Sequence, residues 1–411
     1  MRIISDFHFH SKYSRACSPE LNLENIQAWG KRKGVSLLGT NDFTHPVWFK
    51  ELQAKLEQAE PGLYKLKGSQ EKIRFVFSAE ISCIYKQGGR CRRVHVCLMV
   101  PSLETAEKII ENFNKRNFNL KADGRPIIGL SAKNLAEVVF EIDPESIVYP
   151  AHIWTPWFAV FGSKSGFDSL EECFEEITPY IFAAETGLSS DPPMNWRLSA
   201  LDDIALLSNS DAHSPANIGR EANVFETDGL SYSEIRDIIR KRDKRFLYTI
   251  NFFPEEGRYY LDGHADCRYS CFPDESKRNK NICPVCKKEL TLGVMHRVDD
   301  LADRKEGDPK GRIPCKNLVS LQKIVADALN QGKNTKKVVN EYFRMTDLYP
   351  EYEIILDLDE KELEKISSKE MSRAIINVRN KEVEKIGGYD GVYGKIIVSK
   401  KPKKNQENRL F

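Results

Sequence analysis

Short apolar runs alternate with longer helix-like stretches through the first part of the chain. Between the first two runs, Leu23, Ile26 and Trp29 recur at helical spacing, and Gly34 follows where a helix C-cap is expected. Runs that alternate with helices are typical of a parallel β/α arrangement, so the pattern predicts an α/β fold. The predicted strands are the seven runs at residues 3–4, 35–38, 75–77, 94–100, 147–149, 181–184 and 205–207.

The pattern changes after residue 254. A cysteine cluster comes first, and the charged segment 305–312 (KEGDPKGR) is expected to be a linker or an exposed loop. Apolar residues then recur at helical spacing, with Ser368 as a candidate N-cap, before a strand-like run at 396–398. The predicted organisation is a barrel at 1–254, a zinc-binding domain at 255–300, a mainly helical domain at 301–399 and a basic flexible tail at 400–411.

Histidines and acidic residues follow these predicted strands. His8 and His10 come two residues apart after the first run, so both side chains point to one side of an extended segment. In a β/α barrel the C-terminal strand ends meet in one bowl, where residues distant in sequence converge. The other members are Asp42 and His45 after the second run, Glu80 at the end of the third, His95 within the fourth, His152 after the fifth, Glu185 after the sixth, and Asp211 and His213 after the seventh.

Imidazoles and carboxylates that converge in one place are typical of a divalent metal site. A single histidine at a strand end is more often structural, but repetition across seven runs favours a cluster of divalent cations, with Zn, Mg or Mn as candidates. A bound cation lowers the pKa of its water, and Asp42 and Asp211 are the candidate catalytic residues that orient this water. The predicted ligands are His8, His10, Asp42, His45, Glu80, His95, His152, Asp211 and His213.

The segment from His8-Phe9-His10 to Asp211-Ala212-His213 resembles the PHP (polymerase and histidinol phosphatase) superfamily. The resemblance covers roughly residues 1–250 and implies a distorted seven-stranded β/α barrel that holds two or three metals and hydrolyses phosphoesters. Two departures stand out. The second motif reads Asp42-Phe43 in place of Asp-His, with His45 two residues later, and residues 11–15 contain no acid. The resemblance leaves open the roles of Asp42 and His45 and the number of metals.

The four cysteines of the second module have zinc spacing. Cys267-x3-Cys271 is followed after eleven residues by Cys283-Pro284-Val285-Cys286, which predicts one structural zinc bound by four thiolates. His264 and His296 flank the cysteines and are alternative ligands. The module is basic and suits nucleic acid, with Arg268, Lys277, Arg278, Lys280, Lys287 and Lys288.

The order of these modules also resembles the endonuclease Q family of DNA repair enzymes. The resemblance implies hydrolysis of the phosphodiester 5′ of uracil, hypoxanthine, xanthine and abasic sites, and damaged DNA as the partner. A small-molecule phosphatase of PHP type, or another DNA phosphoesterase or exonuclease, is the alternative; the added modules at 255–399 favour DNA. The supporting stretches, besides the cysteines, are 8–14 (HFHSKYS), 39–46 (GTNDFTHP), 150–157 (PAHIWTPW), 189–199 (SSDPPMNWRLS) and 293–304 (GVMHRVDDLADR).

Aromatic and polar residues beyond the fifth and sixth strands are candidates for DNA contact, since an enzyme that selects a base profits from extruding it onto aromatic faces. A lid or core patch and a capped helix start are the alternatives. These candidates are Trp154, Trp157, Asn195, Trp196 and Arg197.

Composition adds little to this interpretation. The net charge of +2 neither requires nor excludes a polyanionic partner. The sequence contains no apolar run near the ~20 residues that span a bilayer, no signal peptide is expected, and clustered cysteines fit a reducing compartment, so a soluble cytoplasmic protein is predicted. The end of the tail, 406–411, resembles peptides that dock on sliding clamps, which makes a clamp a candidate partner.

Overall fold

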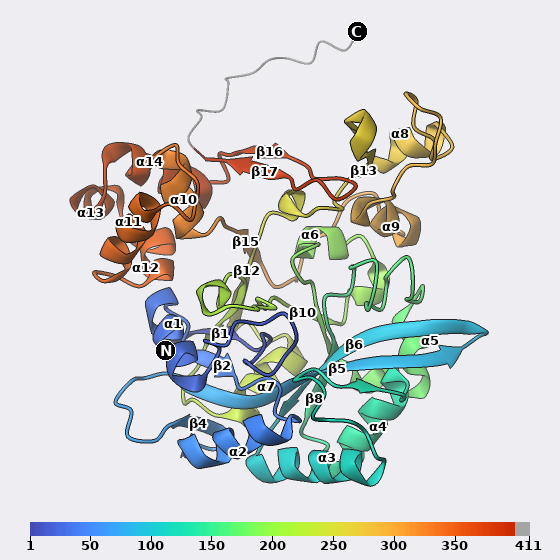
Figure 1. Cartoon of the computed structure of the whole chain (residues 1–411), viewed down its shortest axis with the longest axis vertical. Coiled ribbons are helices and arrows are strands. Elements are labelled where there is room, and N and C mark those ends of the chain that lie inside the picture. The colour runs from blue at the N-terminus through green and yellow to red at the C-terminus, as the bar shows by residue number, and fades with distance from the viewer. Residues whose placement is uncertain (399–411) are drawn as a thin grey trace.

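The computed structural model describes residues 1–398 and places the barrel below two smaller modules (Figure 1). Each of the seven predicted runs lies in or overlaps a strand. Five of these strands, β1, β2, β5, β6 and β8, belong to one sheet that β11 and β12 extend, while β9 and β10 form a separate two-stranded sheet. The barrel strands are β1 (Arg2–Asp6), β2 (Leu37–Gly39), β5 (Arg74–Gln87), β6 (Arg90–Val100), β8 (Ile147–Pro150), β9 (Ala183–Glu185), β10 (Ala205–Leu207), β11 (Ala222–Glu226) and β12 (Phe246–Asn251).

Helices cover the outside of the barrel. The first is capped at both ends: the Asn22 side chain accepts from Asn25 N–H, and Gly34 adopts a left-handed φ of 83° at the C-cap. The helices are α1 (Leu23–Lys33), α2 (Pro46–Lys55), α3 (Leu103–Lys115), α4 (Ala132–Ile142), α5 (Leu170–Phe174), α6 (Pro192–Asn195) and α7 (Tyr232–Lys241); the short strands are β3 (Leu56–Glu60), β4 (Leu63–Leu66) and β7 (Ile127–Ile128); and the 3-10 helices are η1 (Glu175–Tyr180), η2 (Ser199–Leu201) and η3 (Pro215–Asn217).

The predicted parallel β/α arrangement holds for only part of the strands. β1–β2 and β2–β5 are parallel, but β6 runs antiparallel to both β5 and β8, and β11 runs antiparallel to β1. The cause lies in Gly88 and Gly89, whose φ values of +58° and +74° close a tight β5–β6 hairpin. His95 therefore reaches the bowl from the middle of a reversed strand.

The chain beyond the barrel forms a cysteine-containing module on one side and a helical module on the other (Figure 1). A returning hairpin links them, because Gly388 N–H bonds to the Glu255 carbonyl and Leu261 N–H to the Gly388 carbonyl, both at 2.9 Å. The elements are η4 (Pro254–Glu256), β13 (Asp262–His264), η5 (Ala265–Cys267), β14 (Tyr269–Cys271), α8 (Pro273–Arg278), α9 (Val294–Leu301), β15 (Cys315–Asn317), α10 (Leu321–Ala328), α11 (Lys336–Thr346), α12 (Glu351–Leu356), α13 (Glu360–Ile366), α14 (Lys369–Arg379), β16 (Glu384–Ile386) and β17 (Lys395–Ile397).

Several sequence predictions hold in these modules. Segment 305–312 is irregular, and Ser368 caps α14 by accepting from Met371 N–H. β15 pairs in parallel with β12, so the C-terminal half also adds a strand to the barrel sheet. Within residues 1–398, no helix is both long and apolar enough to span a bilayer. The predicted tail at 400–411 and its sliding-clamp segment lie outside the described residues.

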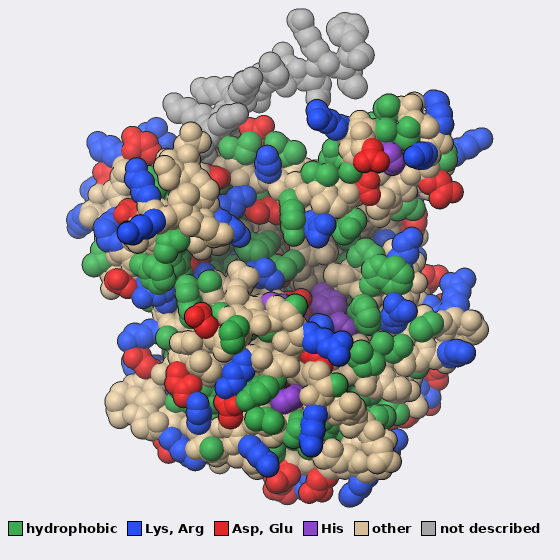
Figure 2. Space-filling view, viewed as in Figure 1, with side chains coloured by type: hydrophobic (Ala, Val, Ile, Leu, Met, Phe, Trp, Pro, Cys, Tyr) green, Lys and Arg blue, Asp and Glu red, His purple; other side chains and the backbone are tan. Residues whose placement is uncertain are grey.

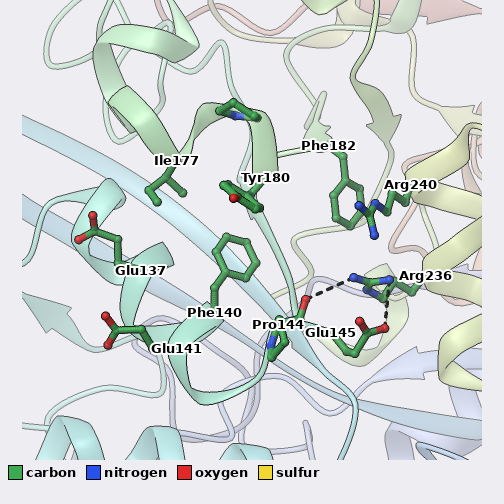
Figure 3. A pocket seen from close by; sticks show the side chains of 11 residues that line it. Glu137, Phe140, Glu141, Pro144, Glu145, Ile177, Tyr180, Phe182, Arg236 and Arg240 are labelled. Atoms are coloured by element: carbon green, nitrogen blue, oxygen red, sulfur yellow. Dashed lines mark hydrogen bonds and ion pairs between the residues drawn. The ribbon is translucent and has the colours of Figure 1, made fainter.

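A cavity of about 800 Å³ opens between α4, η1 and α7 (Figure 3). Pro144, Glu145 and Phe182 lie on its wall just before β8 and β9 begin, so the cavity belongs to the N-terminal face of the barrel. The metal-type side chains gather at the opposite face.

Candidate metal centre

The His8-Phe9-His10 and Asp211-Ala212-His213 motifs lie against each other at the C-terminal end of β1. Phe9 and Ala212 form a parallel bridge, His10 N–H donates to the Ala212 carbonyl at 3.0 Å, and Asp211 N–H donates to the His8 carbonyl at 2.8 Å. Asp211 adopts a left-handed φ of 45°, a conformation that costs free energy in a non-glycine residue and is common at functional sites. The backbone thus aims residues about 200 positions apart into one bowl.

Six of the nine predicted ligands converge there. Ligand atoms of His8, His10, Glu80 and Asp211 lie within 4.8 Å of one another, and Glu80, His95 and His152 form a second such group. Glu80 belongs to both: its Oε2 is 3.4 Å from His10 Nε2, and its Oε1 is 2.7 Å from His95 Nδ1. This carboxylate would contribute one oxygen to each group if both held a cation. Figure 2 shows histidine side chains on the floor of a hollow between the barrel and the upper modules.

The donor set fits divalent cations. His8 Nε2 is buried without a hydrogen-bond partner anywhere in residues 1–398, as expected of a ligand atom. Burial lowers the pKa of His95 to about 4, which keeps its imidazole neutral and able to donate a lone pair. Burial alone would raise the pKa of Asp211, but the hydrogen bond from His10 and the charge of His8 hold it well below its usual range.

Glu185 orients His8 from behind. Its carboxylate lies 3.0 Å from His8 Nδ1, and it also accepts from Asn209 Nδ2 and from His152 N–H, both at 2.9 Å. A carboxylate on the far nitrogen fixes the tautomer of a metal-binding histidine and raises its basicity. Glu185 is therefore a positioning residue for the cluster.

Three predicted ligands do not join the two groups. Asp42 lies behind His10: its Oδ1 is 3.3 Å from His10 Nδ1, and its Oδ2 accepts from Ser11 N–H and Ser14 Oγ. His45 instead caps α2, where its Nδ1 accepts from Trp48 N–H, and its ring stacks on Tyr13 with centroids 4.5 Å apart. His213 packs edge-on against His10 at the rim, with ring centroids 4.7 Å apart.

Arg125 is a site residue that the sequence analysis missed. Its Nη1 lies 3.0 Å from Glu80 Oε2, so a guanidinium reaches the bowl from an irregular segment outside the strand pattern. Gly124 makes this approach possible, because a Cβ there would lie 2.4 Å from Asp42 Oδ2 and 2.3 Å from Ser14 Oγ. The Asp123-Gly124-Arg125 turn was the available signal, but its polarity resembled that of any surface loop.

In the cysteine module, the side chains that lie close enough to hold a metal differ from the predicted four cysteines. Ligand atoms of His264, Cys267, Cys283 and Cys286 lie within 4.8 Å of one another, whereas Cys271 is outside this group. Cys271 ends β14, opposite Asp262 of β13, and the same hairpin brings His264 to the cluster. This set suits a tetrahedral structural zinc. His296, the other alternative, bonds to Asp262 at 2.6 Å.

Most DNA-contact candidates are occupied by internal contacts. Trp154 Nε1 donates to Asn195 Oδ1 at 2.7 Å, and both side chains are buried. Arg197 pairs with Asp299 of α9 at 2.6 Å, and the carbonyl of half-buried Trp196 accepts from Arg304. Trp157 is 50% exposed and stays available.

Comparisons with known proteins agree with this architecture. A family model described as PHP-associated matches residues 196–243. The lesion-specific endonuclease PfuEndoQ from Pyrococcus furiosus is similar over 96% of this chain and 95% of its own, with a TM-score of 0.86 and 30% identity. A structure of endonuclease Q in complex with a 27-mer duplex substrate, with an abasic lesion at the active site, is similar over 98% of this chain and 99% of its own. The TM-score is 0.84 and the sequence identity is 30%. An uncharacterized Methanocaldococcus jannaschii protein is 31% identical over 61% of this chain, which spans 32% of that relative's length.

A barrel that joins two groups of histidines and carboxylates through one shared glutamate defines a metal-binding hydrolase of the PHP type. The similarity to endonuclease Q extends over nearly the whole chain at 30% identity. The chain belongs to the endonuclease Q family. It is therefore an enzyme, a hydrolase that acts on DNA.

Proposed function

We propose that this protein is a DNA repair endonuclease that hydrolyses the phosphodiester 5′ of deaminated bases, namely uracil, hypoxanthine and xanthine, and of abasic sites. The observation that carries the proposal is the Glu80-bridged cluster in a chain similar over its whole length to an endonuclease Q bound to an abasic duplex. The hollow above the cluster supports a substrate larger than a metabolite (Figure 2).

His8, His10, Glu80 and Asp211 would hold one cation, and Glu80, His95 and His152 a second. Such cations supply Lewis-acid activation of water and stabilise charge on the phosphate. Asp211 keeps 26% of its side chain exposed, so it can orient the attacking water. Asp42 has its oxygens engaged behind His10 and acts by positioning that ring.

Arg125 supplies a fixed positive charge beside the reacting phosphate. Its guanidinium is anchored by Glu80, yet a quarter of the side chain remains exposed toward the bowl. Guanidinium groups bind phosphate oxygens with two parallel hydrogen bonds and stabilise charge that grows in the transition state. Arg125 therefore orients the phosphate and stabilises its hydrolysis.

The cysteine module supports the proposal as a structural element. His264, Cys267, Cys283 and Cys286 would hold a zinc with four protein ligands, so its role would be structural and not catalytic. Arg297 of α9 bonds to the Phe161 and Phe167 carbonyls at 3.0 Å, so the module fixes the loop beyond His152.

The test of lesion choice uses 5′-labelled duplexes that carry one uracil, hypoxanthine, xanthine, abasic site or no lesion. Wild type with Mg or Mn is expected to nick each lesion duplex directly 5′ of the lesion and to leave the intact duplex uncut. Asp211→Ala is expected to lose this activity. Equal cutting of intact DNA would contradict a repair role.

A further inference from the structure

A basic pocket lies outside the metal bowl, beside the tip of the β5–β6 hairpin that projects from the barrel (Figure 1). Its volume is about 260 Å³, and it is lined by the first residues of β6, the loop at residues 162–166 and α9. Arg90, Arg92, Lys164 and Arg297 contribute four cationic side chains to its wall, against one acidic residue, Asp300.

The acidic groups nearby are already neutralised. Asp300 pairs with Lys277 at 2.9 Å, and Asp168, just beyond the loop, pairs with Arg297 at 2.6 Å. Arg90, Arg92 and Lys164 form no ion pair with any residue in the described part of the chain. Arg92 also keeps a buried Nε without a hydrogen-bond partner in residues 1–398, although its guanidinium stacks on Phe167. Arg90, Arg92 and Lys164 thus give the pocket positive charge that no ion pair within residues 1–398 balances.

The loop at residues 162–166 is tightly packed at two glycines and exposes Lys164 to solvent. A Cβ at Gly162 would lie 2.7 Å from the Thr155 carbonyl oxygen, and one at Gly166 would lie 2.3 Å from the Val160 carbonyl oxygen, so only glycine fits both corners. Ser165 is buried between them, where its Oγ bonds to the Arg93 carbonyl. Lys164 is exposed at the apex of this fixed turn.

The pocket is continuous with the metal centre along β6. Arg93 N–H bonds to the Ser165 carbonyl, and two residues further His95 N–H bonds to the Phe158 carbonyl at 2.9 Å. Between pocket and bowl, the Arg93 guanidinium lies 5.5 Å from the ring centre of exposed Trp157. His95 and Arg90 are five residues apart on β6, roughly 16 Å at the usual rise of a strand.

From this arrangement, and on the basis of the proposed function, we propose that the pocket binds phosphates of one duplex arm beside the cleaved bond. DNA advances about 3.4 Å per base pair along each strand, so roughly five base pairs separate the pocket from the reacting phosphate. Contacts of this kind fix the position of the duplex without reading its sequence. Arg90 and Lys164 are DNA-binding residues, and they act on lesion and intact duplexes alike.

The test compares Arg90→Ala/Lys164→Ala with Arg240→Ala/Lys244→Ala, which removes two exposed cations at the N-terminal face of the barrel. Binding of labelled duplexes is measured by fluorescence anisotropy over a range of salt in the Asp211→Ala background, which leaves the DNA uncut. The pocket variant is expected to bind roughly tenfold more weakly near 0.1 M salt, with a salt slope of log Kd smaller by about two. The control variant is expected to match its parent.

Duplexes with one arm shortened to about four base pairs supply the second readout. Shortening the arm that reaches the pocket is expected to abolish the difference in Kd between the pocket variant and its parent. Shortening the opposite arm is expected to leave that difference unchanged. If wild type cuts lesion DNA but the pocket variant binds like the control, the pocket assignment alone is overturned. If wild type neither binds nor cuts any duplex, the proposed function fails and the pocket assignment falls with it.

Discussion

At the scale of single residues, Glu221 is a fully buried acid. One oxygen accepts from Phe252 N–H at 2.9 Å, while the other is buried without a partner in residues 1–398. Burial raises the pKa of Glu221 from its ordinary 4.5 to about 8. Between these values the folded protein holds a proton that the unfolded chain has released, so stability falls as pH rises through this window.

Glu221→Gln removes this titration. We expect the unfolding free energy of wild type to fall relative to that of the variant by up to about 1.4 kcal/mol per pH unit between pH 5 and pH 8, because one proton is involved. Urea unfolding of both proteins across this pH range measures the difference in unfolding free energy. The contributions of all other titratable groups cancel because the two proteins share them. Parallel stability curves would contradict the raised pKa.

Arg125→Ala tests the phosphate-binding role. Because Arg125 contacts Glu80 but is not among the ligand groups, we expect kcat on an abasic duplex to fall roughly 100-fold while bound metal is retained. Arg15→Ala, on the same face but with 74% of its side chain exposed, is expected to change kcat little. Metal analysis accompanies the kinetics. Loss of metal in Arg125→Ala would assign Arg125 to the support of Glu80 instead.

At the scale of elements, the strand pattern could be predicted because each run carries its own apolar signal. The candidate ligands that follow β1 and β8, and Glu80 after the apolar run within β5, followed from that signal, but the reversal of β6 depends on a two-glycine hairpin that strand periodicity does not register. His45 was indistinguishable in sequence from a ligand, since its capping bond to Trp48 is visible only in three dimensions. Arg125 lies in an irregular segment, where no periodicity exists.

The zinc module illustrates the same limit. Spacing favoured four cysteines, yet the β13–β14 hairpin brings His264 toward the other three cysteines and leaves Cys271 outside the ligand group. We expect Cys271→Ser to retain the module's zinc, and His264→Ala or Cys283→Ser to lose it. The zinc content per chain of the purified proteins decides between the set that contains His264 and the set of four cysteines. Zinc loss in Cys271→Ser would restore the four-cysteine site.

At the scale of the whole molecule, a buried ion pair joins the barrel to the helical module. Lys33 of α1 lies 2.6 Å from Glu351 of α12, with 5% of each side chain exposed, and the Tyr342 hydroxyl and the Leu321 N–H also donate to Glu351. Removing one partner leaves a buried charge uncompensated. The pair therefore fixes how the helical module sits above the barrel.

Lys33→Met is expected to lower the free energy of unfolding by about 3 kcal/mol. Lys31 lies on the same helix and forms an exposed ion pair with Glu71. Lys31→Met is expected to lower the free energy of unfolding by less than about 1 kcal/mol. Urea unfolding of the two variants measures both losses. Equal effects would mean that the modules are held together by apolar packing alone.

The central claim is that the Glu80-bridged cluster holds cations that hydrolyse DNA beside a lesion. The most direct measurement follows cleavage of a 5′-labelled abasic duplex by enzyme stripped of metal with a chelator and then supplied with Mn or Mg, with p-nitrophenyl phosphate as a parallel substrate. We predict no cleavage before metal is restored, a single nick 5′ of the abasic site afterwards, and no nick with Asp211→Ala. Restored enzyme that releases phosphate from p-nitrophenyl phosphate but leaves every duplex intact would contradict the account.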